Sequence, residues 1–332
     1  MTDTSWGMLS NQAVGAAGIV YFLALIAHLV EWSALSARKR VPAEALVGAG
    51  APVEERVADD DREHRVELFG RLGFLLTIIA VAAHFVALVG RGMAADPNRV
   101  PWGNMYEFTL SGTFVVAAAY VVLHRRFALQ WMAPIVVTFV LVCLMVAVLW
   151  LYEPVAELTE ALNSYWLVIH VVSAILATGA FTLGGIVSAA YLVKARVGSR
   201  EASGIVGGWL SRVPSLDVLD RIAYRIHAFG FPVWTFAVLI TGPIWAHQAW
   251  SSYWNWDPKE VWAFITWVVY AGYLHARATA GWRGRNAAIL ALVGVATLWF
   301  NFIGINYFSS TSQHSYAAPA QPTAPATPPA LG

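Results

Sequence analysis

Residues 245–262 read WAHQAWSSYWNWDPKEVW and contain five of the chain's 16 tryptophans. Tryptophan commonly anchors a membrane helix at the water interface, because its ring tolerates both lipid and water. Five in one stretch are more than two helix ends require. On a helix, Trp250, Trp254 and Asp257 share one face, at positions i, i+4 and i+7. That spacing predicts an aromatic platform for a large flat apolar ligand; a dense aromatic belt without a ligand is the alternative.

The same stretch also contains the signals of a helix start. Asp257 is a good N-cap, Pro258 occupies the first helical position, and Glu260 completes a capping box. We therefore expect an apolar helix to begin at about residue 258, so that the platform lies where a membrane helix meets water. The predicted platform residues are Trp245, Trp250, Tyr253, Trp254, Trp256, Asp257 and Trp262.

The composition indicates a membrane protein. Of the 332 residues, 58% are hydrophobic and only 12% are charged, whereas a soluble domain carries about 25% charged residues. We predict an all-α, polytopic helical bundle, whose first apolar run is a retained helix and not a cleaved signal. Windows of about twenty apolar residues mark about eight spans, at 13–35, 69–90, 107–124, 129–151, 164–193, 226–248, 259–276 and 287–308.

Basic residues are distributed unevenly between the two sides of this bundle. The loops that gather them are 36–68, 125–128, 194–225 and 277–286. With these loops on one side, and with Arg71 at its edge, all of the 21 lysines and arginines lie there except Arg91, Arg99 and Lys259. The positive-inside rule makes this side cytoplasmic. Both termini and the platform are then predicted to lie outside.

Cysteine usage and charge placement exclude several functions. Cys143 is the only cysteine, and neither CxxC nor CxxCH occurs, so the chain cannot run dithiol chemistry alone and is not itself a c-type cytochrome. The lone thiol is expected to pack as a small hydrophobe. Because the basic residues lie at helix ends, nothing indicates nucleic-acid binding. We expect a surface helix around Leu216–Arg225, in the longest of the later loops.

Two histidines are predicted to lie beside the platform. His170 is near the outer end of the fifth span, and His314 follows the eighth. Imidazole nitrogens on two sides of a flat aromatic shelf are what bis-axial ligation of a haem iron requires. For each residue alone, the alternative is a hydrogen-bonded interfacial histidine.

Three further histidines lie near helix ends or the platform. His275, near the inner end of the seventh span, is a functional candidate because ionisable groups within membranes are costly. His227 opens the sixth predicted span and is expected to be a helix-end residue. His247 lies inside the platform stretch, where a role in its polar rim is expected.

The remaining four histidines are interpreted as structural. His28 and His84 lie within spans, where either could be a ligand, although interhelical hydrogen bonding is the favoured role. His64 and His124 lie in or beside charged segments and are expected to be solvated.

The pattern WAxxAWxxYWxWDPKExW resembles the tryptophan-rich WWD signature of haem-handling proteins. It is most similar to the CcsA/ResC subunit (CcsB in actinobacteria) of the System II cytochrome c synthase. Shorter segments agree in order with that family: PWGNMYE (101–107), YWLVIH (165–170), GFP (230–232), YLHAR (273–277), GWRG (281–284) and HSY (314–316). One departure is Ser251, where the family usually has glycine, and we expect local adjustment there without loss of function.

The resemblance implies three haem-iron ligands. His170 and His314 match the external histidines of the WWD site, and His275 matches an intramembrane histidine for haem in transit. The second intramembrane ligand of that family belongs to a ResB-like partner subunit.

The chain is predicted to divide into three regions: a helix and charged loop at 1–67, a haem-handling membrane domain at 68–316, and a Pro/Ala-rich tail at 317–332, to which we assign no structure.

The implied function is part of a holocytochrome c synthase in the plasma membrane. Its cargo is haem b, and its protein substrate is apocytochrome c with a CxxCH motif. Expected partners are the ResB-like subunit and a thioredoxin-like thiol reductant. Three alternatives stay open: a haem exporter or chaperone without ligation activity, a b-type electron carrier, and a membrane scaffold that binds no haem.

Overall fold

The computed structural model describes residues 2–36, 53–155, 164–201, 210, 212–309 and 312, and within these ranges every regular element is a helix. The apolar runs form long helices because lipid offers no partners for backbone N–H and C=O groups. In chain order they are α1 (Asp3–Ser36), α2 (Val53–Met93), α3 (Met105–Leu123), η2 (Gln130–Met132), α4 (Ala133–Trp150), α5 (Tyr165–Glu201), α6 (Leu216–Thr235), η5 (Phe236–Thr241), α7 (Gly242–Trp250), α8 (Pro258–Thr279), α9 (Arg285–Trp299), η6 (Phe300–Gly304) and α10 (Ile305–Phe308).

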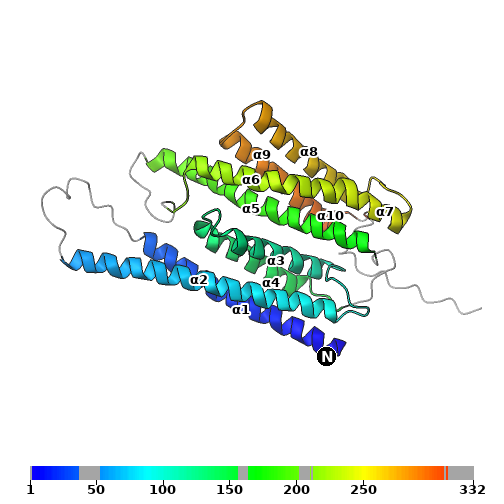
Figure 1. Ribbon diagram of the computed structural model, residues 1–332, viewed down its shortest axis with the longest axis horizontal. Coiled ribbons are helices and arrows are strands. Elements are labelled where there is room, and N and C mark those ends of the chain that lie inside the picture. Colours follow the sequence, from blue (N-terminus) through cyan, green and yellow to red (C-terminus); the bar gives the residue numbers. More distant parts are fainter. Residues whose placement is uncertain are drawn as a thin grey trace, which may run out of the picture.

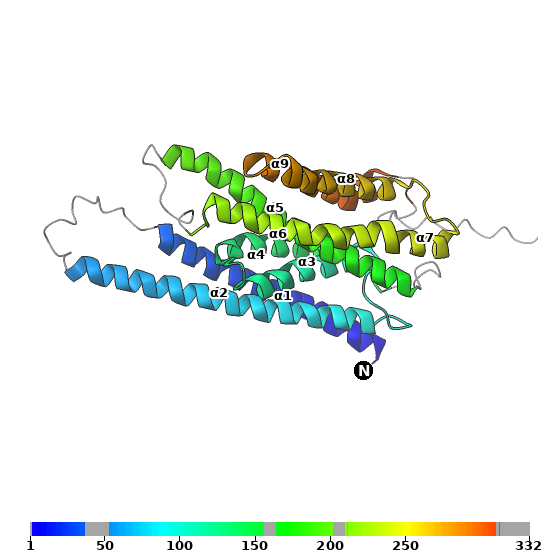
Figure 2. The same ribbon diagram turned by 45° about the horizontal axis from the view of Figure 1, so that its top comes forward.

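The helices run roughly parallel or antiparallel to one another, in successive pairs (Figures 1 and 2). The α1–α2 hairpin lies on one side and contacts α4 and α3, and the α8–α9 pair lies on the other. Between them, α5 contacts α3, α6, α7 and α9. We call the end that carries α7 the platform end; the start of α1 lies at the same end (Figure 1). The predicted polytopic, all-α bundle is confirmed.

Seven helical segments among the described residues are long and apolar enough to cross a membrane. They correspond to seven of the expected spans. The remaining span, 259–276, lies in α8, which is 22 residues long but less apolar. Because α7 ends at the platform end and α9 runs back toward it, α8 has to cross the bundle as well (Figure 1).

The prediction of a separate surface helix around Leu216–Arg225 is wrong. These residues form the first turns of α6, which continues through η5 into α7. Their apolar side chains, Leu219, Ile222 and Ala223, are buried in the helical core. The segment is amphipathic because one face packs against protein, and not because it lies on a membrane surface.

Candidate functional site

The aromatic stretch is not one helix, so the prediction that Trp250, Trp254 and Asp257 share a helical face is wrong. Helix α7 ends at Trp250, where Ser251 adopts a left-handed conformation (φ 57°) and its N–H donates to the carbonyl of His247 at 2.9 Å. Residues up to Asp257 then form an irregular loop, in which Trp256 also has a positive φ of 56°. A left-handed C-cap is the position where glycine is favoured, so the backbone at Ser251 suits glycine better than serine.

Within this loop the tryptophans take different positions. Trp245 is buried, stacks parallel to the His170 ring with centroids 5.9 Å apart, and contacts Trp250 edge-on at 4.8 Å. Trp254 lies edge-on to Trp256, which is 74% exposed. Trp262 packs on Phe300 at 4.2 Å. The platform is therefore layered: Trp245 and Trp254 face inward, and Trp256 faces away from the core.

A large cavity opens beneath this loop, between α3, α4, α5, η5, α7, α8 and η6. The empty space between its walls, including open solvent at the mouth, is about 1400 Å³. Of the predicted site residues, the wall includes His170, Trp245, Tyr253 and Trp254, whereas Trp250, Trp256, Asp257, Trp262 and His275 are not part of it. The loop thus supplies one wall of an elongated, mainly apolar cavity that extends into the bundle.

Four side-chain polar atoms in the cavity wall are buried without a hydrogen-bond partner: Thr109 Oγ1, Thr182 Oγ1, Trp254 Nε1 and Asn301 Oδ1. A buried polar group without a partner is costly, about 1–3 kcal/mol, so four around one cavity indicate a place for a ligand with polar groups. Lys259 also lines the wall. Because Glu260 lines the wall as well, the cavity suits a ligand that is mostly apolar and carries a few polar groups.

The ring of His170 is held in one orientation by the backbone. Its Nδ1 lies 2.9 Å from the carbonyl oxygen of Ala237, which can only accept, so Nδ1 carries the proton. Ala237 lies in the π-helix η5, where its carbonyl also accepts from the backbone N–H of Gly242, five residues later. Single-turn π-helices are frequent at functional sites. With Nδ1 protonated, Nε2 has the lone pair that metal ligation uses.

Asp257 caps α8 as predicted. Its Oδ1 accepts from the Lys259 N–H at 2.8 Å, and Glu260 Oε2 accepts from the Asp257 N–H, which completes the capping box. The same Oδ1 also accepts from the hydroxyl of Ser312 at 2.8 Å. His314 itself lies outside the described residues. Asp257 therefore joins the start of α8 to the segment that precedes His314.

His275 does not join this site. It is exposed, on the side of α8 away from the cavity, whereas Thr266, Tyr270 and Tyr273 form the buried face of the helix. A ligand bound by His275 would therefore contact the outer surface of the bundle.

Two histidines differ from their predicted environments. His227 is completely buried against Phe181 and Tyr270, because α6 begins well before it; the helix-end prediction is wrong. His124 is also buried, stacks on Phe74 at 3.9 Å and lies 3.0 Å from the Tyr120 hydroxyl, so the solvated prediction is wrong. In both cases an apolar neighbouring helix covers a position that looked peripheral in the sequence.

Among the other histidines, His84, His64 and His247 agree with their predictions, whereas the interhelical hydrogen bond predicted for His28 is replaced by a contact within its own helix. His84 Nδ1 lies 3.5 Å from the Tyr21 hydroxyl of α1, an interhelical contact. His28 Nδ1 lies 3.4 Å from Glu31 in its own helix. His64 is exposed, and His247 is an exposed residue stacked on Tyr253 at the platform.

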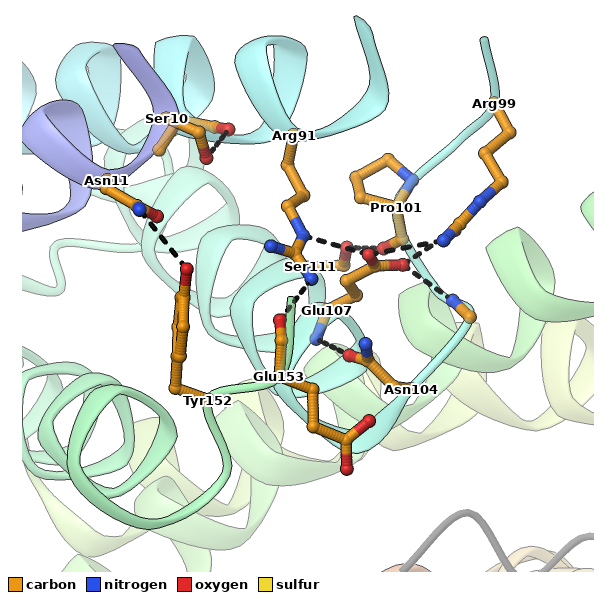
Figure 3. Close-up of polar contacts among 12 residues, drawn as sticks. Ser10, Asn11, Arg91, Arg99, Pro101, Asn104, Glu107, Ser111, Tyr152 and Glu153 are labelled. Atoms are coloured by element: carbon orange, nitrogen blue, oxygen red, sulfur yellow. Dashed lines mark hydrogen bonds and ion pairs between the residues drawn. The ribbon is translucent and has the colours of Figure 1, made fainter. Parts of the chain in front are cut away.

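A buried ionic cluster supports the platform end, and the sequence reasoning missed it (Figure 3). The Glu107 carboxylate accepts from Arg91 Nε at 2.9 Å, from Arg99 Nη1 at 2.7 Å and from the Gly103 N–H at 2.7 Å. Asn104 caps α3. The loop held by this cluster carries Trp102, which packs against the apolar cluster that contains Trp245. The sequence contains one indication of this cluster: Arg91 and Arg99 are two of the three basic residues predicted to lie on the outer side of the membrane.

Together, fold and site define a class: a polytopic helical membrane protein with an aromatic loop over a mainly apolar cavity. The family model described as "Cytochrome C assembly protein" matches residues 102–312. The chain is 30% identical over 271 residues to the cytochrome c biogenesis protein CcsA of Mesostigma viride, covering 76% of this chain and 87% of that protein. It is 36% identical over 197 residues to CcsA of Synechococcus elongatus, covering 48% and 60%.

Among solved structures, the cytochrome c heme lyase CcmF matches with a TM-score of 0.56 and 16% identity, covering 92% of this chain and 49% of that one. This likeness shows a shared fold over about half of the larger protein. The chain belongs to the cytochrome c assembly protein family and resembles its CcsA-type members. Its role is in cytochrome c maturation.

Proposed function

We propose that the chain is the membrane subunit of a System II cytochrome c synthase, which moves haem b across the membrane and presents it for attachment to apocytochrome c. The observation that carries the proposal is the arrangement at His170. A histidine with a backbone-fixed Nδ1 proton stacks on Trp245 and lines a large apolar cavity. These features suit a flat porphyrin, whose central iron takes an axial histidine ligand.

The cavity also fits the edges of the porphyrin. Haem combines an apolar ring with two carboxylates. The wall combines apolar residues with the indole N–H of Trp254 and the ammonium group of Lys259, which also donates to Asn306. His170 and His314 would ligate the iron of the presented haem. His275 would hold a haem in transit, and its exposed position is consistent with a second ligand from a ResB-like partner.

The chemistry of attachment needs positioning more than acid–base groups. Each thiol of a CxxCH motif adds across a vinyl group: a carbon–sulfur bond forms, and the thiol hydrogen goes to the neighbouring vinyl carbon. The addition is redox-neutral but requires reduced cysteines, hence the proposed thioredoxin-like reductant. This chain would hold the vinyl groups toward the incoming thiols. We place it in the plasma membrane, with the platform outside, on the charge asymmetry of its loops.

Co-expression with the ResB-like partner and an apocytochrome tests the proposal. Haem staining after denaturation is expected to show covalent haem on the cytochrome, with roughly a tenfold or greater loss for His170→Ala. His247→Ala is the matched control, because His247 is a platform histidine outside the cavity wall. Haem that the complex binds and then releases without attachment would indicate an exporter or chaperone. Haem that stays bound and never chases into cytochrome would indicate an electron carrier.

A further inference from the structure

The interior of the bundle is closed between the cavity and the end opposite the platform. Directly below the cavity, Phe181 and Tyr270 stack face to face, with centroids 3.7 Å apart and planes at 5°. His227 packs against both rings and against Tyr273. All four residues are at most 1% exposed. A porphyrin cannot pass this plug without separating three helices.

The outer face of α8 offers a different path. Phe264, Val268, Gly272 and His275 are exposed along one side of this helix. His275 follows Phe264 by three turns, about 16 Å along the axis. A Cβ placed on Gly272 would have no neighbour within 4 Å, so the surface beside His275 is open.

Aromatic rings connect this face to the cavity. Trp267 stacks on Phe264 at 5.8 Å and 10°, and on Phe231 of α6 at 5.7 Å and 29°. Phe264 in turn lies edge-on to Trp254 at 6.4 Å, and Trp254 is part of the cavity wall. The ring of Trp267 is fixed by a hydrogen bond from Nε1 to Thr235 Oγ1 at 2.9 Å. The contacts form a continuous aromatic surface from the middle of α8 to the cavity.

The far end of this surface is rigidly held. Arg277, two residues beyond His275, donates to both oxygens of Asp220 at 2.7 and 3.0 Å and so ties α8 to α6. Its guanidinium also lies over the Tyr224 ring. The position of His275 relative to the aromatic surface is therefore fixed by the fold.

We infer that the outer face of α8, and not the bundle interior, is the route by which haem moves from His275 to the platform cavity. This inference rests on the proposed function. The porphyrin lies against Phe264 and Trp267, crosses the open surface at Val268 and Gly272, and enters the cavity past Trp254. The route explains why an intramembrane histidine faces outward while the cavity is closed below.

Blocking this face tests the route in the full chain with its ResB-like partner. Gly272→Trp adds bulk where no neighbour lies within 4 Å, and Val293→Trp is the control on the exposed face of α9. We expect Gly272→Trp to lower holocytochrome yield roughly tenfold. In a His170→Ala background, only the site at His275 fills with haem. We therefore expect the amount of haem per purified complex to be equal with and without Gly272→Trp.

Three outcomes would overturn the route: an unchanged holocytochrome yield, a loss of haem in the His170→Ala background, or a loss of the partner from the purified complex. Loss of haem in the His170→Ala background would make the outer face of α8 part of the haem site at His275. Loss of the partner would make this face part of the subunit interface. A wild-type complex without bound haem or holocytochrome would instead defeat the proposed function. The two failures are therefore distinguishable.

A thiol on the route supplies a second readout. In a Cys143→Ala background, Val268→Cys places a thiol beside a passing vinyl group, across which it adds without an oxidant or reductant. We expect haem stain on this chain itself after denaturation, and none on Val293→Cys. Absence of stain on Val268→Cys, or equal stain on both variants, would contradict passage over α8.

Discussion

His170 and His275 occupy opposite kinds of environment in the same molecule. His170 is half-buried, bonded to a backbone carbonyl, stacked on Trp245 and part of a cavity wall. His275 is exposed on the outer face of α8, away from any of these contacts. The first site is almost complete within the chain, whereas the second offers one surface only. Under the proposed function, this difference assigns presentation of haem to this subunit and makes its intake a task shared with a partner.

The largest expected effect comes from removing the support of the platform end. Glu107→Ala would leave the buried Arg91 and the half-buried Arg99 without their carboxylate, at a cost of about 3–5 kcal/mol. We expect a clear loss of thermal stability of the purified protein, measured by fluorescence-detected size exclusion. Glu67→Ala removes the exposed ion pair with Arg71 and is the control, with an expected cost below about 1 kcal/mol. Equal melting of the two variants would contradict the role of the cluster.

The orientation of His170 is tested at Gly242. A Cβ here would lie 3.0 Å from the Ala237 carbonyl oxygen and 3.2 Å from His170 Cε1. Gly242→Val should displace the ring and weaken haem binding at the platform by roughly 10–100-fold, as for other changes that disturb the orientation of a ligand. Gly272→Ala, at the open surface of α8, should leave this affinity unchanged. Haem titration in a His275→Ala background measures it, and equal affinities would show that η5 does not position His170.

A smaller effect is expected at Asp257. Asp257→Ala removes both the cap of α8 and the acceptor for Ser312, and should destabilise the protein by about 1 kcal/mol. Asp257→Asn keeps an oxygen at that position and should melt like the wild type. Ser312→Ala keeps the cap but releases the segment before His314, so it should alter haem binding more than stability. If Asp257→Asn loses as much stability as Asp257→Ala, then the negative charge of Asp257, and not its oxygen acceptor alone, stabilises the protein.

The smallest effect should be favourable. Ser251 has a left-handed conformation at the end of α7, which costs a non-glycine residue about 1–2 kcal/mol. Ser251→Gly removes that cost but adds chain entropy to the unfolded state, for a net gain of about 0.5–1 kcal/mol. Thermal melting of the single variant measures the gain. A lower melting temperature would mean that the serine side chain has a stabilising contact.

Local signals predicted the helices well. The capping box at Asp257 correctly gave the start of α8 at Pro258, and long apolar runs gave the spans. Tertiary arrangement was not predictable from the same signals. One left-handed residue, Ser251, ends the helix that the spacing of Trp250 and Trp254 suggested. The environment of His227 depends on α5 and α8, which are distant in sequence.

The site was predictable in its residue types but not in its construction. His170 and the inward-facing Trp245 could be named from the sequence, because their positions near one membrane boundary follow from span counting. The carbonyl of Ala237 that holds His170 could not, since a π-helix has no sequence period of its own to detect. The same limit applies to Glu107, whose two arginine partners come from a different helix and a loop.

The absorption spectrum of the haem-loaded complex shows whether His170 ligates the platform haem. Measured in a His275→Ala background, it reports the platform haem alone. We expect a low-spin, bis-histidine spectrum in the parent, a high-spin spectrum with His170→Ala, and recovery of the low-spin form on addition of imidazole, which fills the vacated position. An unchanged low-spin spectrum with His170→Ala would show that the iron is held by other residues and would contradict the account.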